Sequence, residues 1–251
     1  KQISDRTTVM RDGKYVDTLN TKDATVDKII SLMVGRTIFQ EAPHIPSGKS
    51  QPVVLEAKNL NNGRFVRNVS FKLHKGEILG FAGLVGAGRT EVLRTIFGAD
   101  KLISGEILIH GKKVRISRPQ DAVEYGLGYL SEDRKLLALA LPLDIEANTV
   151  LGVFKRFARF GLTNSRKIQL AAEKQVKDLS IRTPSTKQRV SNLSGGNQQK
   201  VAIGKWLTAD SEIIIFDEPT RGIDVGAKSE IYKLMNDLID QGKSIVMISS
   251  E

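Results

Sequence analysis

Short apolar runs alternate with amphipathic stretches along most of the chain and predict an α/β core. Three apolar runs have the length of buried strands and end at glycine or polar residues, at 77–82, 213–216 and 244–249. Helical periodicity marks the stretches between and after them, at 91–97, 119–126, 201–207 and 228–239. Such alternation is typical of an open α/β sheet covered by helices. Patterns of period two predict further strands at 53–60 and 66–73, and a hairpin at 107–116.

Residues 144–179 follow a helical pattern throughout, and 165–179 are clearly amphipathic. Phe154, Phe157 and Phe160 recur at every third position in this stretch and share one face of the predicted helix. We interpret this aromatic stripe as part of the core, because a stripe at helical spacing usually packs inward. The alternative is a docking face for another subunit.

The first 52 residues are expected to stand apart from the main domain. Residues 8–16 predict two short strands around an Asp12-Gly13 turn, and residues 25–34 predict a helix that ends at Gly35. Residues 1–40 thus form a hairpin plus a helix, and residues 41–52, rich in Pro, Gly and Ser, form a linker. Gly48-Lys49-Ser50 in this linker imitates the end of a phosphate loop, but no apolar strand precedes it.

Composition narrows the class of protein. With 251 residues, 40% of them hydrophobic and 26% charged, the chain can bury a sizeable core, and no apolar run approaches the ~20 residues that a membrane helix needs. The chain has no cysteine, which fits a reducing compartment such as the cytoplasm. Its net charge of +10 suits nucleic acid, an anionic membrane or nucleotide phosphates, although a solvated lysine-rich surface is the simplest explanation.

A glycine-rich loop follows the apolar run 77–82 and opens the helix after it. Its spacing fits the phosphate-loop pattern Gly-x-x-x-x-Gly-Lys-Ser/Thr at Gly83, Gly88 and Thr90, with Arg89 at the lysine position. Backbone N–H groups at such a helix start can bind phosphate. The planar fork of arginine does not reproduce a compact ammonium group, so we expect nucleotide binding with altered placement of the catalytic charge.

Two further motifs carry chemistry. Ser194, Gly195 and Gly196 stand directly before a helical run, which is a second geometry for binding an anion. The apolar run 213–216 delivers Asp217 and Glu218 at the carboxyl end of its strand, where open α/β sheets place their ligands. One carboxylate can hold Mg²⁺ while the other acts on water.

With Gly222-Ile223-Asp224 after them, these motifs occur in an order that resembles the ATP-binding cassette ATPases of membrane transporters over about residues 53–251. The sequence is most similar to the second cassette of double-cassette sugar importers of the ribose/galactose/xylose type. The closer match rests on Leu-Ser-Gly-Gly-Asn-Gln-Gln-Lys at 193–200, Glu-Asp-Arg-Lys at 132–135 and Met-Val-Gly-Arg at 33–36. On this resemblance residues 1–40 are the tail of a preceding cassette. Residues 53–251 are then a cassette cut short at its C-terminus.

The resemblance implies a P-loop NTPase fold of the ATP-binding cassette type, with a mixed sheet core, an antiparallel β subdomain and a helical subdomain at about 136–207. It implies ATP and Mg²⁺ as cofactors, each ATP lying between the phosphate loop of one cassette and the signature of the other. Thr90 and Asp217 would position Mg²⁺, Glu218 would polarise water, and Asp224 would lie where the cassettes meet. The implied phosphate-binding residues are Gly83, Leu84, Val85, Gly86, Ala87, Gly88, Arg89, Thr90 and Glu91. The implied signature residues are Leu193, Ser194, Gly195, Gly196 and Asn197.

Three positions depart from the family pattern at catalytic places. Arg89 replaces the loop lysine, Glu132 replaces the glutamine that senses metal and water, and Ser250 replaces the histidine after the last strand. Loss of one preorganised donor costs about 10²–10³ in rate, so we expect a slow or inactive phosphate site. The signature departs only at Asn197, and Phe65 is a weak candidate for the aromatic that stacks on adenine.

The resemblance also implies the partners. They are the first cassette of the same polypeptide, membrane permease subunits and, indirectly, a sugar-binding protein, with the chain peripheral on the cytoplasmic side of the membrane. One alternative is a regulatory nucleotide-binding module without turnover. A DNA-repair cassette is less favoured, because the interval from Glu132 to Ser194 has no room for a long coiled-coil insertion, and we expect no nucleic-acid partner. The predicted hairpin at residues 8–16 is also a candidate to dock where the cassette's own tail belongs.

Overall fold

The computed structural model describes residues 4–11, 13–35, 51–84, 86–160 and 162–250. Val85 of the predicted phosphate loop, Asp12 of the predicted turn and most of the predicted linker lie outside these residues. No helix among the described residues has the length and apolar character needed to cross a bilayer.

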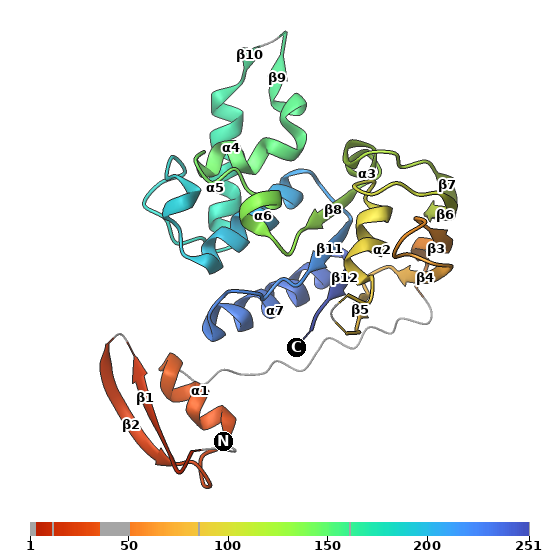
Figure 1. The fold of residues 1–251 in the computed structure, drawn as a ribbon. Coiled ribbons are helices and arrows are strands. Elements are labelled where there is room, and N and C mark those ends of the chain that lie inside the picture. Colours follow the sequence, from red (N-terminus) through yellow and green to blue (C-terminus); the bar gives the residue numbers. More distant parts are fainter. Residues whose placement is uncertain (1–3, 12, 36–50, 85, 161, 251) are drawn as a thin grey trace.

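A four-stranded parallel sheet forms the centre of the main body (Figure 1). Its strands run in the order β5 (Ile78–Phe81), β12 (Ser244–Ile248), β11 (Ile213–Asp217) and β8 (Leu127–Leu130). All three apolar runs predicted as buried strands are therefore strands of this sheet. Every residue of β11 is buried, and its side chains alternate between two cores. Because β11 is central, the two carboxylates at its end lie in the middle of the sheet's carboxyl edge.

Helices cover both faces of this sheet. On one face Ile213 and Ile215 share a core with α2 (Arg89–Ile96) and the antiparallel sheet. On the other face Ile214 and Phe216 share a core with α6 (Gly195–Thr208) and α7 (Val225–Asp240). The short helix α3 (Pro119–Glu124) precedes β8. The predicted helices at 91–97, 201–207 and 228–239 are thus confirmed; α6 and α7 extend beyond their predicted bounds at both ends, and α2 begins and ends earlier than predicted.

A separate antiparallel sheet lies beside the parallel one (Figure 1). Its strands are β4 (Val69–His74), β3 (Val53–Asn61), β6 (Ser104–Ile109) and β7 (Lys112–Val114), in that order. The predicted strand at 66–73 starts later than expected, because Asn68 adopts a positive φ of 54° that interrupts extended backbone. The sequence predicted a core sheet with both parallel and antiparallel strands. Among the described strands, the parallel and antiparallel strands instead lie in two separate sheets.

The region between β8 and β11 is largely helical, but the predicted continuous helix at 144–179 is wrong. The chain forms α4 (Ile145–Val150), a 3-10 helix (Leu151–Phe157), a hairpin of β9 (Ala158–Arg159) and β10 (Leu162–Thr163), and then α5 (Ser165–Asp178). Val153 has non-helical angles of −139° and 30°, Ala158 is extended at −120° and 142°, and Phe160 has a φ of 51°, so each of these positions interrupts the helical conformation. A π-helix (Arg134–Ala138) and a 3-10 helix (Val190–Asn192) complete the region.

The aromatic stripe is divided by this change of conformation. Phe157 packs against the core, as predicted. Phe154 and Phe160 are instead 47% and 90% exposed, so the interpretation of the whole stripe as core is wrong. The reason is that the three rings no longer share a helix face once the chain turns into the β9–β10 hairpin.

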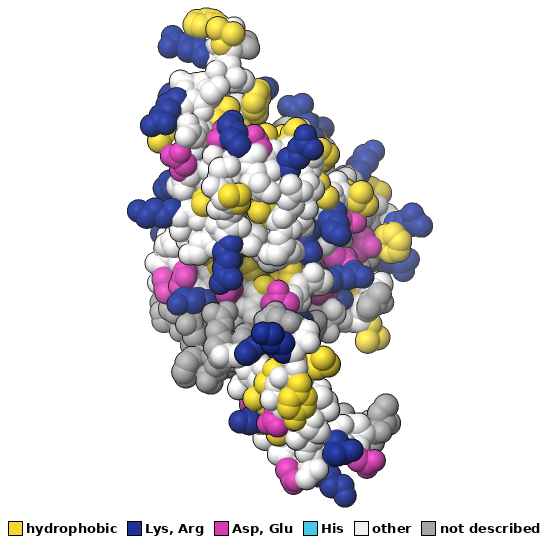
Figure 2. Space-filling view, turned by 90° about the vertical axis from the view of Figure 1, so that its left-hand side faces the viewer, with side chains coloured by type: hydrophobic (Ala, Val, Ile, Leu, Met, Phe, Trp, Pro, Cys, Tyr) yellow, Lys and Arg dark blue, Asp and Glu magenta, His cyan; other side chains and the backbone are white. Residues whose placement is uncertain are grey.

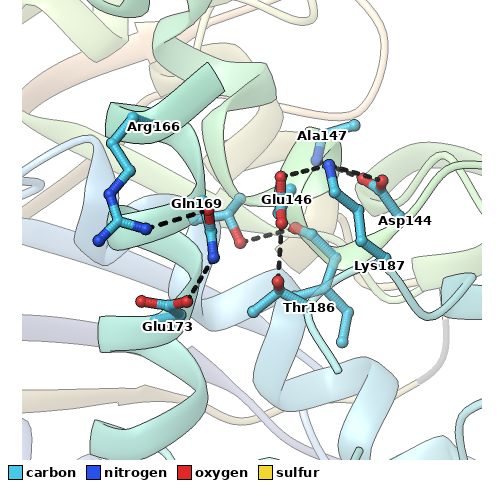
Figure 3. A network of polar contacts seen from close by, with 10 residues as sticks. Asp144, Glu146, Ala147, Arg166, Gln169, Glu173, Thr186 and Lys187 are labelled. Atoms are coloured by element: carbon cyan, nitrogen blue, oxygen red, sulfur yellow. Dashed lines mark hydrogen bonds and ion pairs between the residues drawn. The ribbon is translucent and has the colours of Figure 1, made fainter. Parts of the chain in front are cut away.

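The buried carboxylate of Glu146 on α4 binds residues 186–187 of the loop that precedes the signature (Figure 3). Glu146 is 4% exposed and accepts hydrogen bonds from Thr186 Oγ1 at 2.7 Å and Lys187 Nζ at 2.6 Å. Asp144 accepts from the backbone N–H of Ala147 at 2.8 Å and caps α4. The paired buried carboxylate holds residues 186–187 in place and thereby orients the chain that leads to α6.

The N-terminal segment forms its own small unit of β1 (Arg6–Arg11), β2 (Lys14–Asn20) and α1 (Val26–Val34). Thr25 caps α1 by accepting from Lys28 N at 3.1 Å, and Gly35 ends it with a left-handed φ of 77°. The predicted hairpin and helix are confirmed. In the structure α1 contacts α7, so the unit lies against the side of the main body that α7 covers (Figure 1).

Lys205 on α6 is buried and gives a testable dependence of stability on pH. Its Nζ donates to the carbonyl oxygen of Ala138 at 2.7 Å, and burial lowers its pKa from 10.5 to about 8. Above pH 8 the Lys205 ammonium group loses a proton in the folded chain, whereas in the unfolded chain it retains that proton up to about pH 10.5. The free energy of unfolding of wild type is therefore expected to rise relative to Lys205→Met by about 1.4 kcal/mol per pH unit in this window. Urea unfolding at pH 8 and pH 10 measures it, and a constant difference between the two proteins would contradict it.

Candidate functional site

The glycine-rich loop lies where the carboxyl end of β5 turns into α2. Gly86 and Gly88 adopt φ values of 83° and 86°, which side chains with a Cβ rarely adopt. A Cβ on Gly88 would stand 3.1 Å from the carbonyl oxygen of Phe65, so this end of the loop is closely packed. The first turn of α2 therefore presents its backbone N–H groups at a loop built for close approach.

A cavity of about 460 Å³ opens beside this loop and gathers most of the residues predicted for the phosphate loop and for catalysis. Its described lining consists of Gly86, Ala87, Gly88, Arg89, Thr90, Glu91, Glu132, Glu218, Arg221, Ile248 and Ser250. The three positions predicted to be catalytic, Glu132, Glu218 and Ser250, all lie here. Gly83 and Leu84 are absent from this lining, and Leu84 is 84% exposed.

Thr90 and Asp217 lie in direct contact at the inner side of the site. Thr90 Oγ1 donates to Asp217 Oδ1 at 3.1 Å. Burial raises the pKa of the Asp217 carboxyl, whereas the hydroxyl donors of Tyr129 and Thr90 lower it. A hydroxyl and a carboxylate beside a phosphate loop fit Mg²⁺, which takes few protein ligands and completes its shell with water and phosphate oxygens. The described residues contain no group of three or more His, Cys, Asp or Glu side chains able to hold a metal.

Tyr129 is a member of the site that the sequence did not predict. Its buried hydroxyl donates to Asp217 Oδ2 at 2.6 Å, and β8 places it opposite Ile215 of β11. Burial, with the neighbouring Asp217 carboxylate, raises the pKa of Tyr129, so it remains a hydrogen-bond donor. Donors behind a metal ligand fix the orientation of that ligand. Only the pairing of β8 with β11 identifies Tyr129, and the sequence did not predict that pairing.

Two of the three departures from the family pattern converge on Glu218. Arg89 Nη2 lies 3.9 Å from Glu218 Oε1, and Ser250 Oγ donates to Glu218 Oε2 at 3.1 Å. Arg89 Nη1 also donates to the carbonyl oxygen of Ser249 at 2.9 Å. Glu218 has a φ of 47°, a strained conformation for this residue type. The carboxylate expected to act on water is thus held between a cation and a hydroxyl.

The third departure, Glu132, has a different partner. It forms an ion pair with Arg221, a lining residue that the sequence did not predict. Its neighbour Arg134 donates to the carbonyl oxygens of Arg221 at 3.0 Å and Gly222 at 3.2 Å. The loop after β8 is therefore tied to the segment after β11 through both side-chain and backbone contacts.

The signature residues lie together at the start of α6. Ser194 caps α6 and accepts from Asn197 Nδ2 at 3.0 Å, while Leu193 packs against the core. A Cβ on Gly196 would stand 2.9 Å from Ala227 Cβ, and one on Gly195 would stand 3.4 Å from the Gly222 carbonyl oxygen. Gly196 is thus needed for the close approach of α6 to α7, whereas a Cβ on Gly195 would meet the Gly222 carbonyl oxygen at an ordinary van der Waals distance.

Asp224 is exposed and caps α7 by accepting from Ala227 N at 2.9 Å. It belongs to the same segment, residues 222–227, that packs against the signature. Neither Asp224 nor a signature residue belongs to the described lining of the cavity beside the glycine-rich loop. The structure therefore places two groups of predicted residues at two separate locations on one chain.

A profile of the ABC transporter family matches residues 66–221, more than half of the chain. The chain belongs to the ABC transporter family. This match spans the glycine-rich loop, the signature and the two carboxylates. The motifs at 33–36 and 222–224, and Ser250, lie outside it.

Curated relatives match the whole chain. It is 55% identical over 252 residues to a putative ribose/galactose/methyl galactoside import ATP-binding protein 2 of Burkholderia cenocepacia (strain HI2424), covering 100% of this chain and 49% of the relative. It is 50% identical over 258 residues to a xylose import ATP-binding protein of Thermoanaerobacter pseudethanolicus (strain ATCC 33223 / 39E), covering 100% of this chain and 51% of the relative. The chain therefore spans about half the length of the curated relatives it matches.

Solved structures agree with the fold of this ABC family member. A nucleotide-free ATP-binding cassette from an ABC transporter superposes with a TM-score of 0.68 at 20% identity, covering 79% of this chain and 82% of that one. An ADP-bound cassette superposes with a TM-score of 0.67 at 20% identity over the same shares of the two chains. The ATP-binding cassette fold, with its antiparallel sheet and helical region, is thereby confirmed.

Proposed function

We propose that this chain is the second cassette of a double-cassette importer for a monosaccharide of the ribose, galactose or xylose type. The relatives that match its full length are import ATP-binding proteins for such sugars, and each is about twice as long. On this proposal residues 1–40 are the tail of the first cassette, and the chain is peripheral on the cytoplasmic side of the membrane. Permease subunits are its membrane partners, and a sugar-binding protein delivers the sugar.

The observation that carries an ATP-dependent function is the meeting of Thr90, Asp217 and Glu218 beside the glycine-rich loop. The N–H groups at the start of α2 bind the phosphates, and Thr90 with Asp217 holds Mg²⁺. Bound Mg²⁺ neutralises charge on the transferring phosphoryl group. Tyr129 keeps Asp217 oriented through its 2.6 Å hydrogen bond.

We propose further that this phosphate site turns over slowly. Arg89 is directed at Glu218 and the Ser249 carbonyl, so its charge is shared with the carboxylate that orients water. Glu132 places a carboxylate in the lining of a site that binds an anion, and its ion pair with Arg221 engages that cation as well. Phosphoryl transfer depends mainly on positioning and charge stabilisation. Arg89, Glu132 and Ser250 are therefore proposed to slow phosphoryl transfer more than they weaken nucleotide binding.

The signature is proposed to serve the other cassette. Ser194, Gly195 and Gly196 lie at a helix start away from this chain's own cavity, packed on residues 222–227. Asp224, at the start of α7, is exposed beside them and available for contact with a second cassette. The importer would then hold one working site, built from the first cassette's phosphate loop and this chain's signature.

The pairing of Arg89 with Glu218 also favours a second candidate function. A site whose water-activating carboxylate is engaged by a cation can bind nucleotide and change conformation without turnover, as a regulatory module does. Single-turnover hydrolysis of bound ATP separates the two: measurable product supports the slow ATPase, and none supports the regulatory module.

Equilibrium titration of the chain with Mg-ATP, and with ADP in parallel, tests the nucleotide site. We expect wild type to bind both in the micromolar range, about −8 kcal/mol. Thr90→Val removes the hydroxyl that faces Asp217 and is expected to weaken Mg-ATP binding at least about tenfold. Thr95→Val is the matched control, because Thr95 lies on the same helix but bonds the Glu91 carbonyl and does not line the cavity. Absence of binding by wild type, or equal weakening by both variants, would contradict the proposal.

A further inference from the structure

The hairpin β9–β10 and its flanks carry an unusual charge pattern. From residue 147 to residue 172 the sequence contains no Asp or Glu. The same stretch contains five cations, all exposed: Lys155, Arg156, Arg159, Arg166 and Lys167. Within the described part of the chain none of these five forms an ion pair with a carboxylate; Arg156 donates to the Ala209 carbonyl and Arg166 to Gln169 Oε1. This surface is therefore strongly positive without internal compensation.

Two exposed apolar side chains lie at the end of the same hairpin. Phe160 is 90% exposed and Leu162 is 77% exposed, and both lie at the end of the hairpin. Figure 1 shows β9 and β10 projecting from the helical region, away from the sheets. In Figure 2 hydrophobic atoms lie at this projecting end, with Lys and Arg side chains next to them and below. The guanidinium of Arg159 stands 5.2 Å from the Phe160 ring centroid, so cation and ring form one unit.

An open cavity of about 620 Å³ lies at the base of the hairpin, between it and the start of α5. Its lining includes three of the five cations, together with hydroxyl groups: Arg156, Arg159, Lys167, Thr163 and Ser165. Guanidinium, ammonium and hydroxyl donors around one opening suit a phosphate group. The cavity lies below the apolar end of the hairpin, so a single ligand surface with phosphates above an apolar layer matches both features.

We propose that this hairpin surface binds the anionic headgroups of a lipid bilayer, with Phe160 and Leu162 entering the interface between headgroups and acyl chains. Anionic lipid matches the positive charge, and the acyl boundary removes the two apolar side chains from water. Nucleic acid matches the charge, but it accepts Phe and Leu side chains only by unstacking base pairs, whereas the acyl boundary accepts them without that cost. The surface is independent of the nucleotide site, so the test needs neither ATP nor a permease.

Vesicle flotation of the chain tests the proposal, with phosphatidylcholine vesicles compared with vesicles that also contain phosphatidylglycerol. We expect binding only to the anionic vesicles, and loss of binding as salt is raised. A cation close to an anionic membrane contributes about fivefold to affinity, so the triple variant Lys155→Gln, Arg159→Gln, Lys167→Gln is expected to bind roughly 100-fold more weakly. The matched control is Lys101→Gln, Lys112→Gln, Arg115→Gln, which removes the same charge from exposed positions on and beside the antiparallel sheet. It is expected to keep most of the binding.

A second measurement reports the position of the hairpin end in the bilayer. Trp206 is the one tryptophan of the sequence and is 6% exposed, so a Phe160→Trp variant adds a reporter at an exposed position. We expect the emission of this added reporter to shift to shorter wavelength on anionic vesicles and to be quenched by brominated lipid. Equal flotation on neutral vesicles, no difference between the triple variant and its control, or an unchanged emission of the Phe160→Trp variant would overturn the proposal. Binding to duplex DNA that the triple variant loses, with no flotation on anionic vesicles, would overturn it in favour of nucleic acid.

Discussion

Replacing Gly196 by alanine in a double-cassette importer that carries this chain is expected to lower ATP turnover at least about 100-fold. A Cβ at this position would stand 2.9 Å from Ala227 Cβ, so the start of α6 must move away from residues 222–227. That movement displaces the signature residues that the proposal assigns to the working site of the other cassette. The measurement is sugar-stimulated ATPase activity of the importer reconstituted with its permease and binding protein.

Gly204→Ala is the matched control for this prediction, since Gly204 lies further along the same helix. A Cβ there would stand 3.2 Å from Gln175 Cβ and 3.2 Å from Leu179 Cδ1, so α5 must shift by a few tenths of an ångström at a place eight positions beyond Gly196. We expect turnover close to that of wild type. The reciprocal experiment uses the two phosphate loops: turnover should be lost when the first cassette's loop is destroyed and largely retained in Arg89→Ala. The opposite pattern would refute the assignment of the working site.

Replacing Phe216 by alanine is expected to lower the free energy of unfolding by about 3–5 kcal/mol. Phe216 is fully buried on the central strand β11 and belongs to the core that α6 and α7 complete. Deleting its ring removes apolar contact area and leaves a cavity between the sheet and these helices. Because domains of this size are stable by about 5–15 kcal/mol, the loss is a large part of the total. Urea unfolding followed by circular dichroism measures it.

Phe65→Ala makes the same chemical change at an exposed position and serves as the control. Phe65 is 49% exposed, so its truncation is expected to change the free energy of unfolding by less than about 1 kcal/mol. Its carbonyl lies against Gly88, next to the glycine-rich loop, so the same variant also tests whether the ring stacks on adenine. Equal destabilisation by the two variants would contradict the assignment of Phe216 to the core.

Local patterns in the sequence predicted the parts of the site that depend on neighbouring residues. The apolar run 213–216 predicted a strand that ends in Asp217 and Glu218, and the glycine spacing at 83–90 predicted a turn into a helix. In each case the residues that give the sequence pattern and the element that they predict lie within about ten positions of each other. Short-range backbone preferences and burial determine such elements, so one sequence was sufficient.

Contacts between distant segments were not predictable in this way. Tyr129 reaches Asp217 across 88 positions, and Arg221 reaches Glu132 only because the segments after β8 and β11 lie side by side. The hairpin at 158–163 was missed for a different reason. Its residues keep a helical spacing of apolar side chains, and the conformations of Val153, Ala158 and Phe160 interrupt the helix.

The strand order of the parallel sheet also determines when the phosphate site can form during synthesis. Strand β5, which leads into the glycine-rich loop, pairs with β12, and Gly76 bonds Ser244 across 168 positions. At about 5–20 residues per second, a ribosome takes roughly 10 to 30 s to make the intervening chain. Throughout that interval β5 has no partner in its sheet. The first chemical motif of the cassette to be translated is therefore among the last to become structured.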